Sequence, residues 1–296
     1  TVENQTFGTS VTEKAVTIPG YNLVSDESQT ITIGAGENVI NFYYAKKTNL
    51  SYTVKYLEAG TDEVLAEEKK VEGQTFGTTV KEKAIQIDGY NVTGESEKSL
   101  EIADGTNEII FYYTKKNDLS YVVNYLEKDT NKVLKDSKTE TKQKYKDKVT
   151  EKAAEIDGYV VSGDAEQTLT ISHDNSKNVI NFYYTKRNDL SYTVKYLEKD
   201  TNEALADEKT VKDQTFGETV SEPAKAIDGY TVDAQSKNVK ITTGTNEIIF
   251  YYTKRSDLSY IVRYREKDTE KEIASPKLVE NQTFGETVTE EAIDVD

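Results

Sequence analysis

Alternation between apolar and polar residues is clearest over residues 50–58. Tyr52, Val54 and Tyr56 are separated by polar residues, and this period of two predicts a β-strand. Turn-forming residues follow, so a second strand is expected over residues 64–71 as the return arm of a hairpin.

The most apolar segment, residues 108–114, differs from this pattern. Ile109 and Phe111 would lie on one face of a strand, and Ile110 and Tyr112 on the other. Strands that are apolar on both faces usually lie in the middle of a covered sheet. The first and last strands of this stretch are therefore predicted to be neighbours at the centre of the sheet. If they run parallel, the chain enters the repeat at one end and leaves it at the other.

Weaker signals lie between these two strands. Residues 74–84 are expected to include a short helical turn. Short strands are expected over residues 90–93 and 98–102, and the run Asp104-Gly105-Thr106-Asn107 is typical of a turn.

The same pattern recurs along the chain. Leu-Ser-Tyr begins at residues 50, 119, 190 and 258, and Gly-Tyr begins at residues 20, 89, 158 and 229. The sequence Gln-Thr-Phe-Gly begins at residues 5, 74, 214 and 282, whereas Tyr145 and Lys146 replace its last two residues in the third copy. The predicted organisation is a tandem array of three full repeats flanked by two partial ones: 50–118, 119–189 and 190–257, with 1–49 and 258–296.

Successive repeats are joined by few residues. The joint at residues 115–118 contains neither Gly nor Pro. A joint of this kind favours a head-to-tail rod in which interactions are mainly between neighbouring repeats.

The composition argues against several classes of function. The formal net charge of −16 argues against binding to nucleic acid, which needs clustered Lys and Arg. The absence of Cys excludes disulfides and thiolate metal sites, and no apolar run is long enough for a membrane helix. Because Met is also absent, we expect a part of a longer protein, with any export signal or anchor outside it.

Several spaced segments resemble the MucBP (mucin-binding protein) repeat of surface adhesins in Gram-positive bacteria. They are YTVKYLEKDTNEALADEKTV, QTFGETV, AIDGYTV and NEIIFYYTK in the repeat 190–257. The resemblance covers every full repeat and both partial ones. It implies an extracellular, wall-anchored protein built from small β-grasp-like (ubiquitin-like) domains, in a class between all-β and α+β; immunoglobulin-like β-sandwich repeats are the alternative.

No catalytic or cofactor site is predicted. The one histidine, His173, lies in Ser172-His173-Asp174, and we expect it in a solvated loop, because a working triad is assembled from distant segments. Calcium is a minor alternative at Asp129-Thr130-Asn131 and Asp200-Thr201-Asn202, which offer hard oxygen ligands. Ordinary turns are the favoured interpretation there, because the spacing of a twelve-residue calcium loop is absent.

Tyrosine is abundant, with 21 residues. Most are expected to pack their rings in a thin core and to keep their hydroxyl groups in contact with water. The tyrosines that follow glycine are expected to close the end of each core: Tyr21, Tyr90, Tyr159 and Tyr230. Tyrosines that bind sugar cannot be nominated from the sequence. An intramolecular isopeptide or ester crosslink is a further minor expectation.

The favoured function is the repeat region of a cell-surface adhesin, acting mainly as a semi-rigid stalk. Weak multivalent binding to host mucin glycans is compatible with it. The alternative is a self-associating surface filament, although the negative charge opposes lateral packing.

Overall fold

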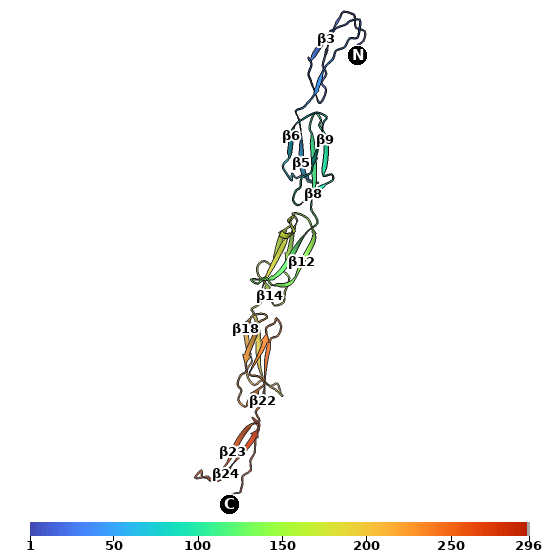
Figure 1. Cartoon of the computed structure of the whole chain (residues 1–296). Helices are drawn as coiled ribbons and strands as arrows, with labels where there is room; N and C mark the ends of the chain where they lie inside the picture. The colour runs from blue at the N-terminus through green and yellow to red at the C-terminus, as the bar shows by residue number, and fades with distance from the viewer. Residues whose placement is uncertain (295–296) are drawn as a thin grey trace. The chain divides into compact units, whose positions relative to one another are not determined.

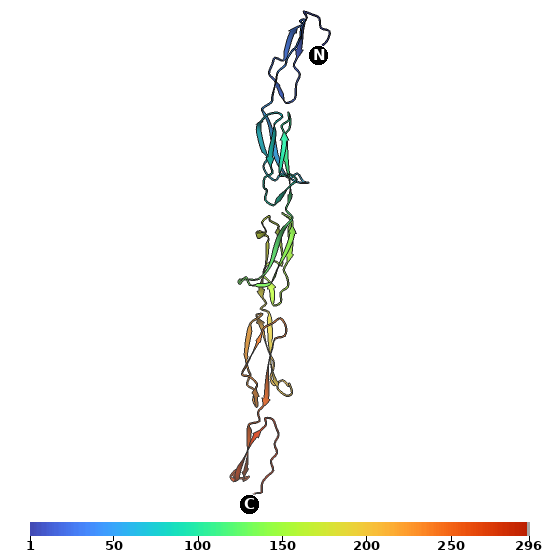
Figure 2. The same cartoon turned by 45° about the vertical axis from the view of Figure 1, so that its right-hand side comes forward.

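The computed structural model describes residues 1–294 (Figures 1 and 2). Two compact units divide the chain, and their boundary lies inside the repeat 119–189. The described residues are nearly all strand, turn and loop, with one short 3-10 helix and no α-helix. The helical turn expected in residues 74–84 is wrong: a turn at Phe76-Gly77 leads directly into a strand.

The repeat 50–118 contains six strands: β5 (Leu50–Glu58), β6 (Lys69–Gln74), β7 (Thr79–Lys83), β8 (Tyr90–Thr93), β9 (Glu97–Glu101) and β10 (Glu108–Lys115). Four of them form a sheet in the order β6-β5-β10-β8, and β7 pairs with β9 in a second sheet. The central strands β5 and β10 run parallel, with Val54 opposite Ile109 and Tyr56 opposite Phe111. The predicted pairing of the first and last strands at the centre of the sheet is confirmed, and the structure shows that the two strands run parallel.

The core lies between these two sheets. Val54 and Phe111 are fully buried, and Tyr113 is 1% exposed. On the opposite face of β10, Ile110 and Tyr112 are only half-buried, so the expectation that both faces are covered is wrong. The two-stranded sheet is the only second layer among the residues described for this repeat.

The second strand begins later than expected. Val64 makes an isolated bridge with Leu57, and the ladder resumes only at β6. Between them, Leu65 and Ala66 turn inward and pack against the core. This inward turn interrupts the strand that the sequence predicts over residues 64–71.

The other full repeats have equivalent strands. Repeat 119–189 contains β11 (Leu119–Glu127), β12 (Val133–Gln143), β13 (Lys148–Lys152), β14 (Tyr159–Val161), β15 (Glu166–Thr170), the 3-10 helix η1 (Asn175–Lys177) and β16 (Val179–Lys186). Repeat 190–257 contains β17 (Leu190–Glu198), β18 (Lys209–Gln214), β19 (Thr219–Pro223), β20 (Tyr230–Val232), β21 (Ser236–Lys240) and β22 (Glu247–Lys254). Its larger sheet has the order β18-β17-β22-β20, and β17 and β22 are again parallel.

The flanking repeats are incomplete. The first contains β1 (Ser10–Lys14), β2 (Tyr21–Leu23), β3 (Ser28–Thr32) and β4 (Tyr44–Lys46); the last contains β23 (Leu258–Arg265) and β24 (Glu272–Gln282). Phe42 and Val262, which correspond to the buried Phe111 and Val54, are only half-buried. The described part of the chain is therefore all-β, while the β-grasp assignment, the immunoglobulin-like alternative and the elongated rod stay predictions. No helix in this part is long and apolar enough to span a membrane.

Candidate functional site: the joints between repeats

The joint after the repeat 119–189 is built on Gly158. This residue has φ +76°, and a Cβ at its position would lie 2.4 Å from the ring of Phe216 in the next repeat. Any side chain would therefore both strain the backbone and collide with the ring. Beside it, Tyr159 packs edge-on against Phe216, with ring centroids 5.7 Å apart. The Gly-Tyr and Gln-Thr-Phe markers of neighbouring repeats thus meet at one contact.

Arg187 links the two markers through its backbone. Its N–H donates to the carbonyl of Gly158 at 2.9 Å, and its carbonyl accepts from the N–H of Phe216 at 2.8 Å. Lys47, Lys116 and Arg255 make the same pair of backbone bonds at the other three joints. The residue after the last strand of a repeat is thereby fixed on both sides.

A loop of the following repeat adds a third contact. The hydroxyl of Thr243, which follows β21, donates to Asp157 at 2.7 Å. At the first joint, Asp104 in the equivalent loop accepts from Lys47 at 2.7 Å and from the N–H of Gly20 at 2.8 Å. The hydrogen bond from Lys47, and then that from Gly20, lower the pKa of Asp104 below its usual value.

The second joint uses different residues for the same geometry. Tyr145 replaces the phenylalanine and covers Gly89, where a Cβ would lie 2.3 Å from its ring. Lys146 takes the place of glycine and keeps a positive φ of 68°. Its Nζ lies 3.3 Å from the hydroxyl of Tyr90. The left-handed backbone is therefore retained although the glycine is not.

His173 belongs to this second joint. Its imidazole packs edge-on against Tyr145, with centroids 6.1 Å apart, and its Nε2 lies 3.9 Å from a carboxylate oxygen of Asp88. The sequence predicts its loop correctly but gives no sign of this contact with the preceding repeat. The adjoining Asp174 caps η1 by accepting from the N–H of Ser176.

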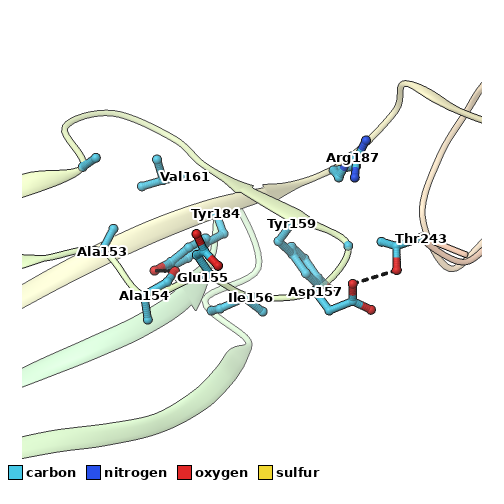
Figure 3. Close-up of a pocket in the computed structure, with 12 residues that line it drawn as sticks. Ala153, Ala154, Glu155, Ile156, Asp157, Tyr159, Val161, Tyr184, Arg187 and Thr243 are labelled. Atoms are coloured by element: carbon cyan, nitrogen blue, oxygen red, sulfur yellow. Dashed lines mark hydrogen bonds between the residues drawn. The ribbon is translucent and has the colours of Figure 1, made fainter.

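A hollow adjoins the joint on the side of the preceding repeat. In repeat 119–189 it has a volume of about 490 Å³. Its lining includes Ile156, Tyr159, Tyr184 and Arg187. Figure 3 shows these side chains around the hollow, with the hydrogen bond from Thr243 to Asp157 at its rim. An equivalent hollow of about 350 Å³, with Ile87, Tyr90, Tyr113 and Lys116 at the matching positions, occurs in repeat 50–118.

The tyrosines that follow glycine do more than close the core. Tyr90 is 7% exposed, whereas Tyr21, Tyr159 and Tyr230 are half-buried. All four pack edge-on against an aromatic ring of the next repeat. Their prediction as end caps missed this partner, because the ring comes from a distant part of the sequence.

The candidate calcium segments form hairpin turns. Asn131 and Asn202 have positive φ values of 55° and 58°, and each donates its N–H to the carbonyl of the last residue in the preceding strand, Glu127 or Glu198. Within residues 1–294, no group of three or more His, Asp or Glu side chains is arranged to hold a metal ion. Calcium binding stays an untested minor alternative, as does an intramolecular crosslink.

A carboxylate joins the two sheets of each full repeat, and it is half-buried in the first two repeats and buried in the third. Glu82 on β7 accepts from the hydroxyl of Tyr52 at 2.6 Å and from Lys69 at 2.7 Å. The Lys69 hydrogen bond, and then that from Tyr52, lower the pKa of Glu82. Burial and the hydrogen bond to Glu82 raise the pKa of Tyr52 to about 12. The same cluster recurs as Tyr121, Lys138 and Glu151, and as Tyr192, Lys209 and Glu222.

Comparison with known proteins identifies the class of these repeats. The MucBP domain model matches residues 52–114, 122–185 and 192–253, so the chain belongs to the MucBP domain family. Each match falls inside one of the full repeats described above.

Two curated relatives are Internalin J proteins of Listeria monocytogenes. One, from strain F2365, is 27% identical over 96% of this chain and 32% of its own length; the other, from strain EGD-e, is 26% identical over 83% of this chain and 29% of its own. The chain thus spans about a third of the relatives it matches.

Solved structures give weaker similarity. The Bacillus anthracis TIE protein is 13% identical, with 83% of this chain and 68% of that chain covered and a TM-score of 0.36. The type 2 repeat of the mucus binding protein MUB from Lactobacillus reuteri is 11% identical, with 69% and 99% covered and a TM-score of 0.15.

Proposed function

We propose that the array is the repeat region of a bacterial cell-surface adhesin and acts as a semi-rigid extracellular stalk. The observation that carries the proposal is the joint, in which the same Gly–aromatic contact and pair of backbone hydrogen bonds recur between successive repeats. A linker held on both sides restricts bending, and a spacer needs this property. Membership of the MucBP family and similarity to Internalin J support a surface location, and anchoring to the cell wall would be through a region outside this chain.

The stiffness of a joint can be measured directly, because the chain has no native Cys. Glu166→Cys and Ser236→Cys place spin labels at equivalent exposed positions on either side of the third joint. A narrow distribution of label distances by double electron–electron resonance is expected. A broad distribution, equal to that of a flexible linker, would overturn the stalk proposal.

Weak binding to mucin glycans is the second candidate function. It is supported by the hollow that recurs beside the joint, which combines tyrosine rings with a cation in two repeats. Aromatic faces can stack on sugars, and binding at several hollows in series would raise the overall affinity. The similarity to a repeat of a mucus binding protein is too slight to add to this argument.

The hollow can be blocked without touching the joint. Ser96 and Ala165 line the two hollows and are exposed, so Ser96→Trp with Ala165→Trp should abolish binding to purified mucin. Tryptophan at the exposed positions Glu101 and Thr170, outside the hollows, is the matched control. Binding that survives in the first variant, or that persists on deglycosylated mucin, would refute this site.

A self-associating filament is the alternative to both functions. The net charge of −16 opposes lateral packing of copies. Sedimentation velocity over a range of salt concentrations tests it: assembly at high salt would favour the filament, and a monomer throughout would exclude it.

A further inference from the structure

The first and last strands of a full repeat receive any tension applied along the chain. The chain enters the repeat 190–257 at the start of β17 and leaves it at the end of β22. These strands are direct neighbours and run parallel, with Thr193 opposite Glu247 and Glu198 opposite Tyr252. Pulling the two ends apart therefore drives β17 and β22 in opposite directions along their own axes.

This geometry loads the hydrogen bonds of the pair together. In a parallel ladder the bonds are evenly spaced along the strands, so none can open alone while the strands slide. A slip by one residue would also move every side chain to the other face of the sheet. That slip is opposed by the core, because Val194 and Phe250 are fully buried on the inner face.

Ion pairs reinforce the pair near both of its ends. Lys195 on β17 binds Glu247 at the start of β22 at 2.6 Å, and Lys254 at the end of β22 lies 3.3 Å from Glu198. In repeat 50–118, Lys55 binds Glu108 at 2.5 Å and Lys115 lies 3.4 Å from Glu58. The same reinforcement thus recurs on the same two strands.

We propose that the parallel β5–β10 and β17–β22 pairs are mechanical clamps, and that resisting tension is a function of the repeats beyond holding a distance. Repeats joined in series carry the same force, so each clamp would protect its own repeat. The proposal does not depend on the stiffness of the joints or on glycan binding.

Two attachment geometries in the full chain separate this clamp from general stability. Ser191→Cys with Thr253→Cys attaches handles at opposite ends of β17 and β22 and loads the pair in shear. Ser191→Cys with Thr245→Cys attaches them at the same end and opens the pair one bond at a time. Ser191, Thr245 and Thr253 are exposed, so both variants should melt at the same temperature.

The measurement is single-molecule force spectroscopy at one pulling speed, since forced unfolding reports the unfolding rate of the loaded structure. The shear geometry is expected to unfold the repeat at severalfold higher force than the opening geometry. Equal forces would overturn the clamp. A lower force in shear would overturn it as well, and equal melting temperatures ensure that neither result arises from misfolding.

Discussion

The second and third joints reach one geometry with different residues. The third uses Phe216 and Gly217, and the second uses Tyr145 and Lys146. The linking backbone hydrogen bonds are nevertheless alike. The backbone nitrogen of Lys116 lies 2.9 Å from the carbonyl oxygen of Gly89, and that of Arg187 lies 2.9 Å from the carbonyl oxygen of Gly158. The positive φ is also kept, at 80° for Gly217 and 68° for Lys146.

This comparison separates what a joint requires from what it tolerates. The covered glycine, Gly89 or Gly158, is required at both joints because the aromatic ring occupies the space of a Cβ. The residue after the ring requires only a left-handed backbone, which lysine can adopt at a cost of about 1 kcal/mol. At the second joint, the contacts of Lys146 with Tyr90 and Tyr145 offset part of that cost.

The largest effect is expected from a side chain under the ring. Gly89→Val should lower the free energy of unfolding of repeat 50–118 by about 1–3 kcal/mol through backbone strain, and should also displace Tyr145. Gly94 is the matched control, because it has the same φ of +81° with nothing within 4 Å of a Cβ. Gly94→Val should carry the strain alone. Spin labels across the second joint should therefore show a broader distance distribution only for Gly89→Val; equal broadening in both variants would show that the ring contact is unimportant.

A smaller effect is expected from removing the ring. Phe216→Ala and Tyr145→Ala each delete a half-buried aromatic ring, which should cost about 1–2 kcal/mol of coupling between neighbouring repeats. Tyr145→Phe should retain most of that coupling, because Phe216 serves the third joint without a hydroxyl. Urea unfolding of the full chain measures these costs, and a Tyr145→Phe variant as unstable as Tyr145→Ala would contradict the comparison.

Exchanging the residue that follows the aromatic ring, Gly217 or Lys146, tests directly which side chains this position tolerates. Gly217→Lys should cost about 1 kcal/mol, the penalty of a left-handed backbone. Lys146→Gly should gain less than this, because it also removes the contacts with Tyr90 and Tyr145. Thermal melting of the two single variants is the measurement, and a loss of stability in Lys146→Gly would mean that the lysine contacts outweigh the strain.

A change in pH is expected to alter the stability of the full repeats with the least difference between them, because the Tyr–Lys–Glu clusters lie away from the joints. Hydrogen bonds from Lys69 and Tyr52 lower the pKa of Glu82, so its stabilisation is present above the usual value of 4.5 and is lost as the pH falls through the lowered value. Burial and the bond to Glu82 raise the pKa of Tyr52 from 10.0 to about 12, so this stabilisation is complete below pH 10.0 and is lost as the pH rises through about 12. Glu82→Gln should flatten the acid limb of the melting temperature against pH; an unchanged profile would exclude the cluster as its source.

The sequence by itself determined most of the strands, the repeats and the pairing of the first and last strands at the centre of the sheet. Alternation at Tyr52, Val54 and Tyr56 is a local consequence of strand geometry, and the doubly apolar segment 108–114 identified a central strand. The local pattern gave the wrong secondary structure where tertiary packing overrides it. Leu65 and Ala66 turn into the core, and residues 74–84 form a turn and a strand.

Only the tertiary structure decided what the residue pairs that recur within the array do. Gly-Tyr of one repeat and Gln-Thr-Phe of the next are separate markers in the sequence, and they meet only because each repeat folds back on itself. The same holds for Glu82 with Tyr52, and for His173 with Asp88. Periodicity reports which face a residue occupies, whereas a partner distant in the sequence is set by how the sheets and loops close over the core.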